Sequence, residues 1–295
     1  MTQAPVMIGL QLPDVSTWSD RIVVALGQNP GILTGPGTNT YLVGTGRERI
    51  LLDAGDGRPA YLPVLAQALE HAGGVSIQEI VVTHGHPDHV GGAPALIEHF
   101  GPLHVSKHPW PGVDEEYPVE TTPLADGALI RTEGATLRAV HTPGHSEDHL
   151  CFVLEEEGTL FSGDNVLGVG TAVIPARGGD LLDYLRSLER LLAEEPHAIY
   201  PAHGPRIPDG KAKLREYLDH RLEREQQILD ALSEGLSRVE GIVKKVYAAY
   251  PEVLHPAAGA SVSAHLLKLE NEGRVRREPG HDPLAAHWRL LASGS

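Results

Sequence analysis

Residues 81–92, VVTHGHPDHVGG, place three histidines and an aspartate within six positions, directly after an apolar pair and directly before two glycines. The apolar pair ends a short strand, and the residues from Asp88 onward have the polar start and later apolar spacing of a helix. In the loop between them, His84 and His86 are two positions apart and project to the same side of an extended chain. Asp88 and His89 begin the helix and can turn back toward that side. This strand–loop–helix segment therefore predicts four metal ligands around one cavity.

The side-chain types in this segment limit which metal ions it could bind. Imidazole and carboxylate together suit Zn²⁺, Fe²⁺ or Mn²⁺. The only cysteine is Cys151, so the chain has no intrachain disulfide and does not contain a cysteine-rich structural zinc site. An isolated H-x-H pair is more typical of a surface loop, but the full H-x-H-x-D-H pattern is far more specific for metal binding.

Three later segments repeat the same arrangement of a strand followed by a potential ligand. They are TPGH, which ends at His145, FSGD, which ends at Asp164, and YPAHG, which contains His203. Each follows an apolar run, and each ligand lies beside glycine or proline. Because ligands at the ends of several strands converge on one edge of a sheet, these three residues are expected to join the first four.

The first two hundred residues alternate apolar runs with glycine and proline punctuation, which is typical of strands and helices joined by turns. Many strands with helices between them predict an α/β sandwich of sheets covered by helices. Strands are expected at 21–27, 39–44, 49–53, 79–84, 137–142, 150–156, 159–164 and 198–204, and helices at 58–73, 88–100 and 180–194.

The pattern changes after residue 204. A long amphipathic helix with dense mixed charge is expected at 209–235, and its HRLERE run is expected to face solvent. Two further helices, at 238–250 and 261–273, precede two strands around a turn, which is the outline of a winged-helix module. The predicted domains are a catalytic domain at 1–205, a connecting helix at 206–235 and a winged-helix-like domain at 236–295.

Charge is distributed unevenly along the 295 residues, whose net charge is −15. Residues 1–205 contain 10 Lys and Arg against 26 Asp and Glu, a balance of −16, whereas the remainder is +1. The field of the first part should repel polyanions such as nucleic acids. A small basic patch could still form on the C-terminal part, from Lys244, Lys245, Arg274, Arg276 and Arg277.

The N-terminal segment and the hydropathy pattern predict a cytoplasmic protein that does not interact with membranes. No Lys or Arg precedes Arg21, so the start lacks the charged region of a secretory signal. No uncharged apolar run approaches the roughly 18 residues of a membrane span.

The ordered motifs resemble the metallo-β-lactamase superfamily, in which an early aspartate, H-x-H-x-D-H, a histidine, an aspartate and a final histidine occur in this order. The early aspartate here is Asp53, in LLDAG. The chain resembles the β-lactamase-like protein 2 family in particular, through GTNTYLVG at 37–44, NVLGVGT at 165–171, HRLEREQQIL at 220–229 and the winged-helix tail. The resemblance covers nearly the whole chain.

This resemblance implies an αββα sandwich and assigns the ligands to two metals. It implies one metal held by His84, His86 and His145, a second held by Asp88, His89 and His203, and Asp164 between them. Asp53 would orient a ligand loop, and His149 is a candidate for a similar supporting role. Asn39 lines the cleft or caps the turn before a strand. The glycine-rich segment at 172–182 differs from the family and is expected to border the cleft.

The chemistry expected of such a site is hydrolysis. Two divalent ions, most often zinc, with manganese or iron as alternatives, lower the pKa of a shared water so that a bridging hydroxide can attack the substrate. Asp88 passes a proton to the leaving group or acts as a ligand alone.

Members of the resembled family include single-strand-specific endoribonucleases and relatives similar to thioesterases that act on carrier-bound polyketides. Because the catalytic domain is acidic, the sequence favours a small-molecule or carrier-bound acyl substrate, which is a thioester, ester, lactone or β-lactam, over single-stranded RNA. A third hypothesis is a nucleic-acid-binding regulator in which the metal site is structural.

Overall fold

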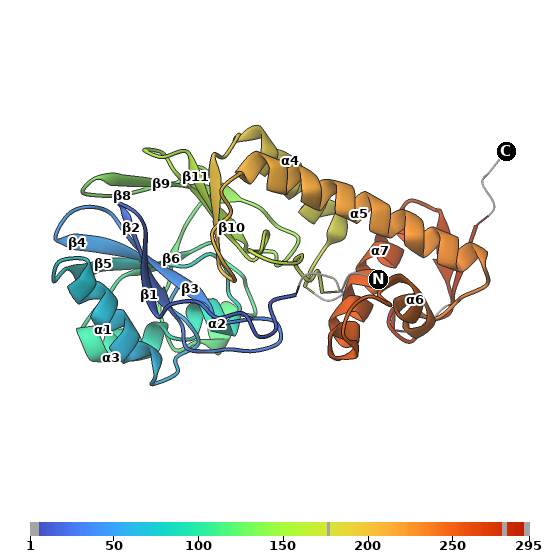
Figure 1. Ribbon diagram of the computed structural model, residues 1–295, viewed down its shortest axis with the longest axis horizontal. Helices are drawn as coiled ribbons and strands as arrows, with labels where there is room; N and C mark the ends of the chain where they lie inside the picture. Colours follow the sequence, from blue (N-terminus) through green and yellow to red (C-terminus); the bar gives the residue numbers. More distant parts are fainter. Residues whose placement is uncertain (1–5, 176–177, 279–281, 292–295) are drawn as a thin grey trace.

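Two β-sheets pack face to face in the computed structural model, which describes residues 6–175, 178–278 and 282–291 (Figure 1). The first sheet has the strand order β1-β2-β3-β4-β5-β6-β7, and the second has the order β12-β11-β10-β9-β8. The strands of the first sheet are β1 Val15–Ser19, β2 Ile22–Leu26, β3 Asn39–Val43, β4 Glu48–Leu52, β5 Ser76–Val81, β6 Val105–Lys107 and β7 Thr122–Pro123. Those of the second are β8 Leu129–Thr132, β9 Ala135–His141, β10 Leu150–Leu154, β11 Thr159–Gly163 and β12 Ala198–Pro201.

Helices cover the outer faces of both sheets, which confirms the expected αββα sandwich (Figure 1). Helices α1 (Tyr61–His71) and α3 (Ala93–Phe100) pack on the first sheet, and α4 (Leu181–Ala193) packs on the second. Between the sheets lies an apolar layer that includes Tyr41 and Phe161. Strands β3, β10 and β11 are buried at every position because apolar layers cover both of their faces.

The helix predicted over residues 88–100 is wrong in one respect, because the structure contains two helices there. These are α2 (Pro87–Val90) and α3. The break lies at Gly92, whose backbone N–H donates to the carbonyl of Gly55 at 2.9 Å. A Cβ atom at Gly92 would lie 2.0 Å from the carbonyl oxygen of Ala54, so only glycine allows this close approach.

The C-terminal part is a small helical module with its own apolar core. Helix α5 (Gly210–Ser233) leaves the sandwich and runs into this module, as Figure 1 shows. The module's other elements are α6 (Val239–Val246), α7 (His255–Asn271), and the antiparallel pair β13 (Val275–Arg277) and β14 (Trp288–Leu290). Two short 3-10 helices also occur, η1 (Asp114–Glu116) and η2 (Glu252–Leu254).

The helix predicted at 261–273 is α7, which begins earlier, at His255. It can begin there because its proline lies in the first turn, where the missing N–H breaks no hydrogen bond of the helix. Part of the predicted turn between the last two strands, at 279–281, lies outside the described residues. The division of the chain at residues 205 and 235 stays a prediction.

The expectation that the HRLERE run faces solvent is wrong for three of its residues. The exposed fractions of Arg221, Arg224 and Glu225 are only 2%, 7% and 8%. They are buried because α4, α6 and α7 all pack against α5. Glu225 receives ion pairs from Lys268 of α7 and from Arg274, which compensates for its burial.

Among the described residues, no helix combines the length and the apolar character that crossing a bilayer requires.

Candidate metal centre

All seven predicted ligands lie together at one edge of the sandwich, in segments that follow strand ends. His84 and His86 follow β5, and His145 lies between β9 and β10. Asp164 directly follows β11, and His203 lies shortly after β12. Their donor atoms form two groups that could each hold a metal ion, and within each group the atoms lie within 4.8 Å of one another. The first group is His84, His86, His145 and Asp164, and the second is Asp88, His89 and His203.

In the first group, three imidazole nitrogens face one another. His86 Nδ1 lies 2.8 Å from His84 Nε2 and 3.0 Å from His145 Nε2. The Nδ1 atom of His145 donates to the carbonyl oxygen of Val173 at 2.9 Å. Because a carbonyl can only accept, the proton of a neutral His145 lies on Nδ1, and its Nε2 offers a lone pair to the centre of the group.

Asp164 faces both groups with different oxygens. Its Oδ2 lies 3.5 Å from His145 Nε2, and its Oδ1 lies 3.1 Å from His203 Nε2 and 3.5 Å from His89 Nε2. The second group is completed by Asp88, whose Oδ2 lies 3.3 Å from His203 Nε2 and 3.5 Å from His89 Nε2. One carboxylate thus lies between two clusters of nitrogen and oxygen donors.

The two groups have different electrostatic environments. In the first, burial and the neighbouring imidazoles lower the pKa of His84 well below its usual value and that of His86 to about 4. In the second, burial opposes protonation of His203, but the carboxylates of Asp164 and Asp88 raise its pKa to about 9. The first group therefore offers neutral nitrogen donors, and the second lies in a negative potential that attracts cations.

The chemistry of the donor set fits metal ions. His89 Nε2 and Asp164 Oδ1 are buried, and within the described residues neither forms a hydrogen bond. Buried polar atoms without partners are costly, and a cation between these atoms would satisfy both at once. Histidine nitrogens and carboxylate oxygens are common ligands of zinc, iron and manganese.

Asp53 holds one ligand from behind. Its Oδ2 accepts from His89 Nδ1 at 2.9 Å and from the Thr83 hydroxyl at 3.0 Å, while its Oδ1 accepts from the Thr83 N–H at 2.8 Å. The proton of His89 is thereby kept on Nδ1, and Nε2 points into the second group. His149 supports Asp164 in a similar way, since its Nε2 accepts from the Asp164 N–H at 3.1 Å.

Asn39 does not line the cleft, which corrects that part of its prediction. Its side-chain amide donates to the carbonyl oxygens of Pro201 and Gly204, at 2.9 Å and 2.8 Å. These residues flank His203, and the Asn39 N–H donates to the carbonyl of Ala202 as well. Asn39 therefore fixes the loop that carries His203.

Three further residues support the site, and the sequence motifs do not reveal them because their contacts join distant segments. The Thr38 hydroxyl donates to Asp88 Oδ2 at 3.0 Å. Asp148 Oδ2 accepts from the Gly85 N–H at 2.7 Å and is paired with buried Lys107 at 3.1 Å. A lysine inside a buried strand was the only sequence signal for this second contact.

A cavity of about 500 Å³ opens over the two groups. Its floor includes His86, Asp88, His145, Asp164 and His203, and its walls are mostly apolar or uncharged. The described part of the segment predicted to border the cleft contributes to these walls. The wall residues that come from this segment are Ala172, Val173 and Pro175.

Comparison with protein families matches residues 33–203 to the metallo-beta-lactamase superfamily. Residues 239–288 match the beta-lactamase associated winged helix domain, in agreement with the winged-helix prediction.

Among curated relatives, the chain is 43% identical to a lactamase-like protein of Aspergillus fumigatus, over 95% of this chain and 87% of that protein. It is 41% identical to a beta-lactamase-like protein 2 homolog of Drosophila melanogaster, over 90% and 93% of the two chains. It is also 41% identical to an atrochrysone carboxyl ACP thioesterase of Aspergillus chevalieri, over 90% and 86%.

Solved structures include a metallo-beta-lactamase family protein from Thermus thermophilus, with a TM-score of 0.74 and 26% identity over 95% of this chain and 99% of that one. A second structure, of a protein in a di-iron-bound form, is 33% identical, with a TM-score of 0.50 over 62% of this chain and 93% of that one.

Proposed function

Because the chain belongs to the metallo-beta-lactamase superfamily, we propose that it is a metal-dependent hydrolase whose substrate is an acyl compound, foremost a thioester. The observation that carries this proposal is the convergence of seven imidazole and carboxylate side chains below an open cavity with mostly apolar walls. The relative named as a carboxyl ACP thioesterase supports a carrier-bound acyl group as the substrate class. Esters, lactones and β-lactams present a similar electrophilic carbonyl.

Two metal ions are proposed, one for each group of donors. The first would be held by His84, His86 and His145 and the second by Asp88, His89 and His203, with Asp164 shared. The similarity to a protein in a di-iron-bound form supports a two-metal site. Zinc is the expected ion, and iron and manganese also fit these donors.

Bound ions would supply Lewis acidity, which lowers the pKa of water and stabilises the negative charge that develops on the carbonyl oxygen. The chain itself supplies position and proton transfer. Asp53 and Val173 hold His89 and His145 so that their Nε2 atoms point toward the other donors of their groups. Asp88 lines the cavity, and its carboxylate is the proposed carrier of a proton to the leaving group.

Single-stranded RNA is a second candidate substrate, and the charges of the C-terminal module argue against it. Four of its five candidate basic residues are engaged in ion pairs with carboxylates in the structure. The pairs are Lys244 with Glu240, Lys245 with Glu234, Arg274 with Glu225 and Arg277 with Glu270. Paired cations attract phosphate weakly, so neither RNA cleavage nor duplex binding by a regulatory protein is favoured.

A hydrolysis panel on the full-length, metal-loaded protein tests this proposal. We expect a neutral acyl thioester to be cleaved faster per active site than a short single-stranded RNA, because the described cavity walls are mostly apolar and the arginine among them, Arg58, is paired with Asp56. Thioester cleavage should change little between 50 and 300 mM salt, since no phosphate contacts are made. RNA cleavage without turnover of any acyl substrate would reverse the assignment. Salt-sensitive duplex binding without any turnover would favour the regulator.

Replacing Asp53 tests how the ligands are held. In Asp53→Asn, an NH₂ group would replace one of the two carboxylate oxygens. The side chain could then no longer accept both from the Thr83 N–H at one position and from His89 and the Thr83 hydroxyl at the other. We expect the affinity for metal to fall about 10- to 100-fold, which is typical of residues that orient a ligand. Competition with a coloured chelator measures this affinity without relying on activity.

The matched control is Asp20→Ala, which removes an exposed carboxylate far from the cavity. It should keep the metal affinity of the original protein. Unchanged affinity in Asp53→Asn would show that the contact with His89 does not support metal binding.

A further inference from the structure

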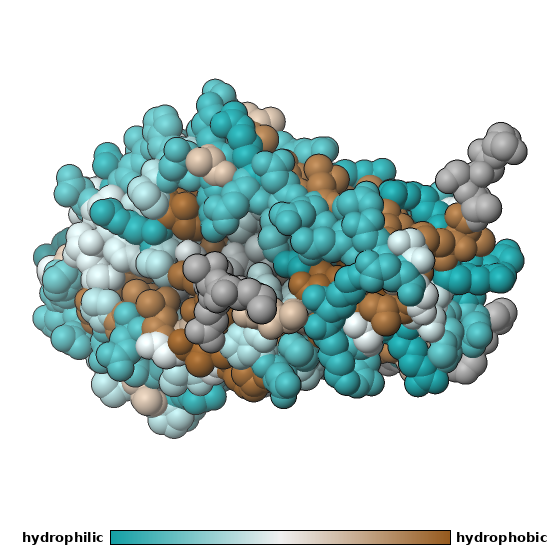
Figure 2. Space-filling view, turned by 45° about the vertical axis from the view of Figure 1, so that its right-hand side comes forward, coloured by the Kyte–Doolittle hydropathy of each residue, from teal (hydrophilic) through white to brown (hydrophobic). Residues whose placement is uncertain are grey.

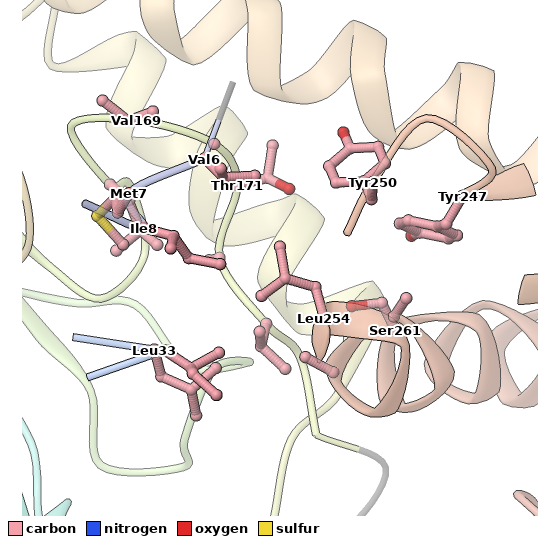
Figure 3. Close-up of a pocket in the computed structure, with 17 residues that line it drawn as sticks. Val6, Met7, Ile8, Leu33, Val169, Thr171, Tyr247, Tyr250, Leu254 and Ser261 are labelled. Atoms are coloured by element: carbon pink, nitrogen blue, oxygen red, sulfur yellow. The ribbon is translucent and has the colours of Figure 1, made fainter. Parts of the chain in front are cut away.

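A second pocket, of about 110 Å³, lies between the sandwich and the C-terminal module (Figure 3). One side is formed by the N-terminal segment and by loops of the sandwich, including Met7, Ile8 and Leu33. The other side comes from the module, with Tyr247 and Leu254 among its residues. None of the described residues that line the pocket carries a charged side chain. Its chemistry therefore suits an apolar group.

This pocket adjoins the cavity over the metal centre. Leu33, Leu167, Ala172 and Val173 line both spaces. Val173 also accepts the hydrogen bond that orients the His145 ring. A molecule whose reacting group lies above the ligands would therefore have to pass only these shared residues to reach the pocket.

The rim of the pocket exposes large apolar side chains. Ile8, Ile32 and Leu33 are 46%, 49% and 58% exposed, and they are three of the nine large hydrophobic residues that the described chain exposes. In Figure 2, hydrophobic residues, coloured brown, lie to the left and to the right of the centre of the view. Exposed apolar side chains gathered around an opening are typical of ligand-binding sites.

Two arginines of α5 hold the pocket's opposite walls. Arg221 Nη2 donates to the carbonyl oxygen of Ala172 at 2.5 Å. Arg224 Nη1 donates to the carbonyl oxygen of Val246 at 2.8 Å, and its guanidinium lies 4.2 Å from the centroid of the Tyr247 ring. One helix therefore fixes both walls, which lowers the entropic cost of binding a ligand between them.

We propose that this pocket binds the apolar body of the acyl group while the acyl carbonyl lies over the metal centre. The inference rests on the proposed function and adds that the C-terminal module selects the substrate. The volume is comparable to that of a cavity of about 150 Å³ that binds benzene, so the pocket suits one ring or a short alkyl chain. A ring and a short alkyl chain are both uncharged apolar groups, so the pocket would bind either of them through the same contacts.

A series of N-acetylcysteamine thioesters with acetyl, butanoyl, hexanoyl and octanoyl groups tests the proposal on the full-length, metal-loaded protein. We expect kcat/KM to rise by up to about fourfold for each methylene that enters the pocket and then to level off, because burying one methylene contributes about 0.8 kcal/mol. A benzoyl thioester should also exceed the acetyl compound.

Substitutions on the module locate the effect. Ala257→Phe, in α7, inserts a ring into the pocket and should lower the ratio of hexanoyl to acetyl kcat/KM by at least about tenfold. Val253→Phe is the matched control, because Val253 lies in η2 beside the pocket, is 52% exposed and does not line it. It should keep the original ratio. If circular dichroism shows that Ala257→Phe is unfolded, Leu254→Ala should lower the same ratio by removing a wall contact.

The outcomes separate this inference from the proposed function. A flat series in the original protein, or an unchanged ratio in Ala257→Phe and Leu254→Ala, would overturn the pocket but leave the hydrolase intact. If no acyl thioester is cleaved, the proposed function fails, and calorimetry with hexanoate then decides the inference. Binding that is weakened by Ala257→Phe and not by Val253→Phe supports the pocket, whereas absent or equal binding overturns it.

Discussion

Asp164→Ala should lower kcat/KM for an acyl thioester by at least about 10³-fold, because it removes the carboxylate that faces both groups of donors. Without it, His145 on one side and His203 on the other lose their shared partner. His86→Ala should have a similar effect, since His86 Nδ1 lies within 3.0 Å of nitrogens from two other histidines. Steady-state kinetics at saturating metal measures both losses.

The fold should survive these substitutions, because the donors lie at the edge of the sandwich while its stability comes from apolar layers inside. The circular dichroism spectrum should therefore resemble that of the control Glu189→Ala, which removes an exposed carboxylate of α4. Normal turnover in Asp164→Ala or in His86→Ala would contradict the ligand assignment.

Most of the sandwich could be predicted from sequence because most of its strands are compact apolar runs between turns. The strands β1, β6, β7 and β8 were not expected, since they are short or partly polar, and both residues of β7 are exposed. The strand expected at 39–44 is β3, and the helix expected at 180–194 is α4. The break between α2 and α3 could not be predicted in this way. It depends on the approach of the Gly55 loop, which is more than thirty residues away in sequence.

The same distinction applies to the site. Its histidines and aspartates could be predicted because each lies in a short motif that follows a strand, and the ends of these strands meet at one edge of the sandwich. Thr38 was missed, since only the tertiary structure brings it to Asp88. Arg221 and Arg224 were expected to be exposed because their run has the charge spacing of a surface helix. Their burial results from packing of α4 and of the C-terminal module against α5, which helical periodicity does not reveal.

Removing the metal should abolish acyl hydrolysis, the second large effect that we expect. The seven donors are proposed to hold two divalent ions. Without these ions, no Lewis acid lowers the pKa of the attacking water. The protein should also become less stable to heat, because ions that bind only the folded state stabilise it by mass action. Dialysis against a chelator followed by kinetics and a thermal scan measures both changes.

The most direct test measures bound metal and thioester hydrolysis in the same samples as zinc, manganese or iron is returned to the chelated protein. Elemental analysis gives ions per chain, and the initial rate gives activity. The two-metal account predicts negligible turnover in the chelated protein and a maximum rate close to two ions per chain, because each group of donors would hold one ion and the two groups would share Asp164. Full turnover in the chelated protein, or a rate that is already maximal at one ion per chain with no further binding, would contradict it.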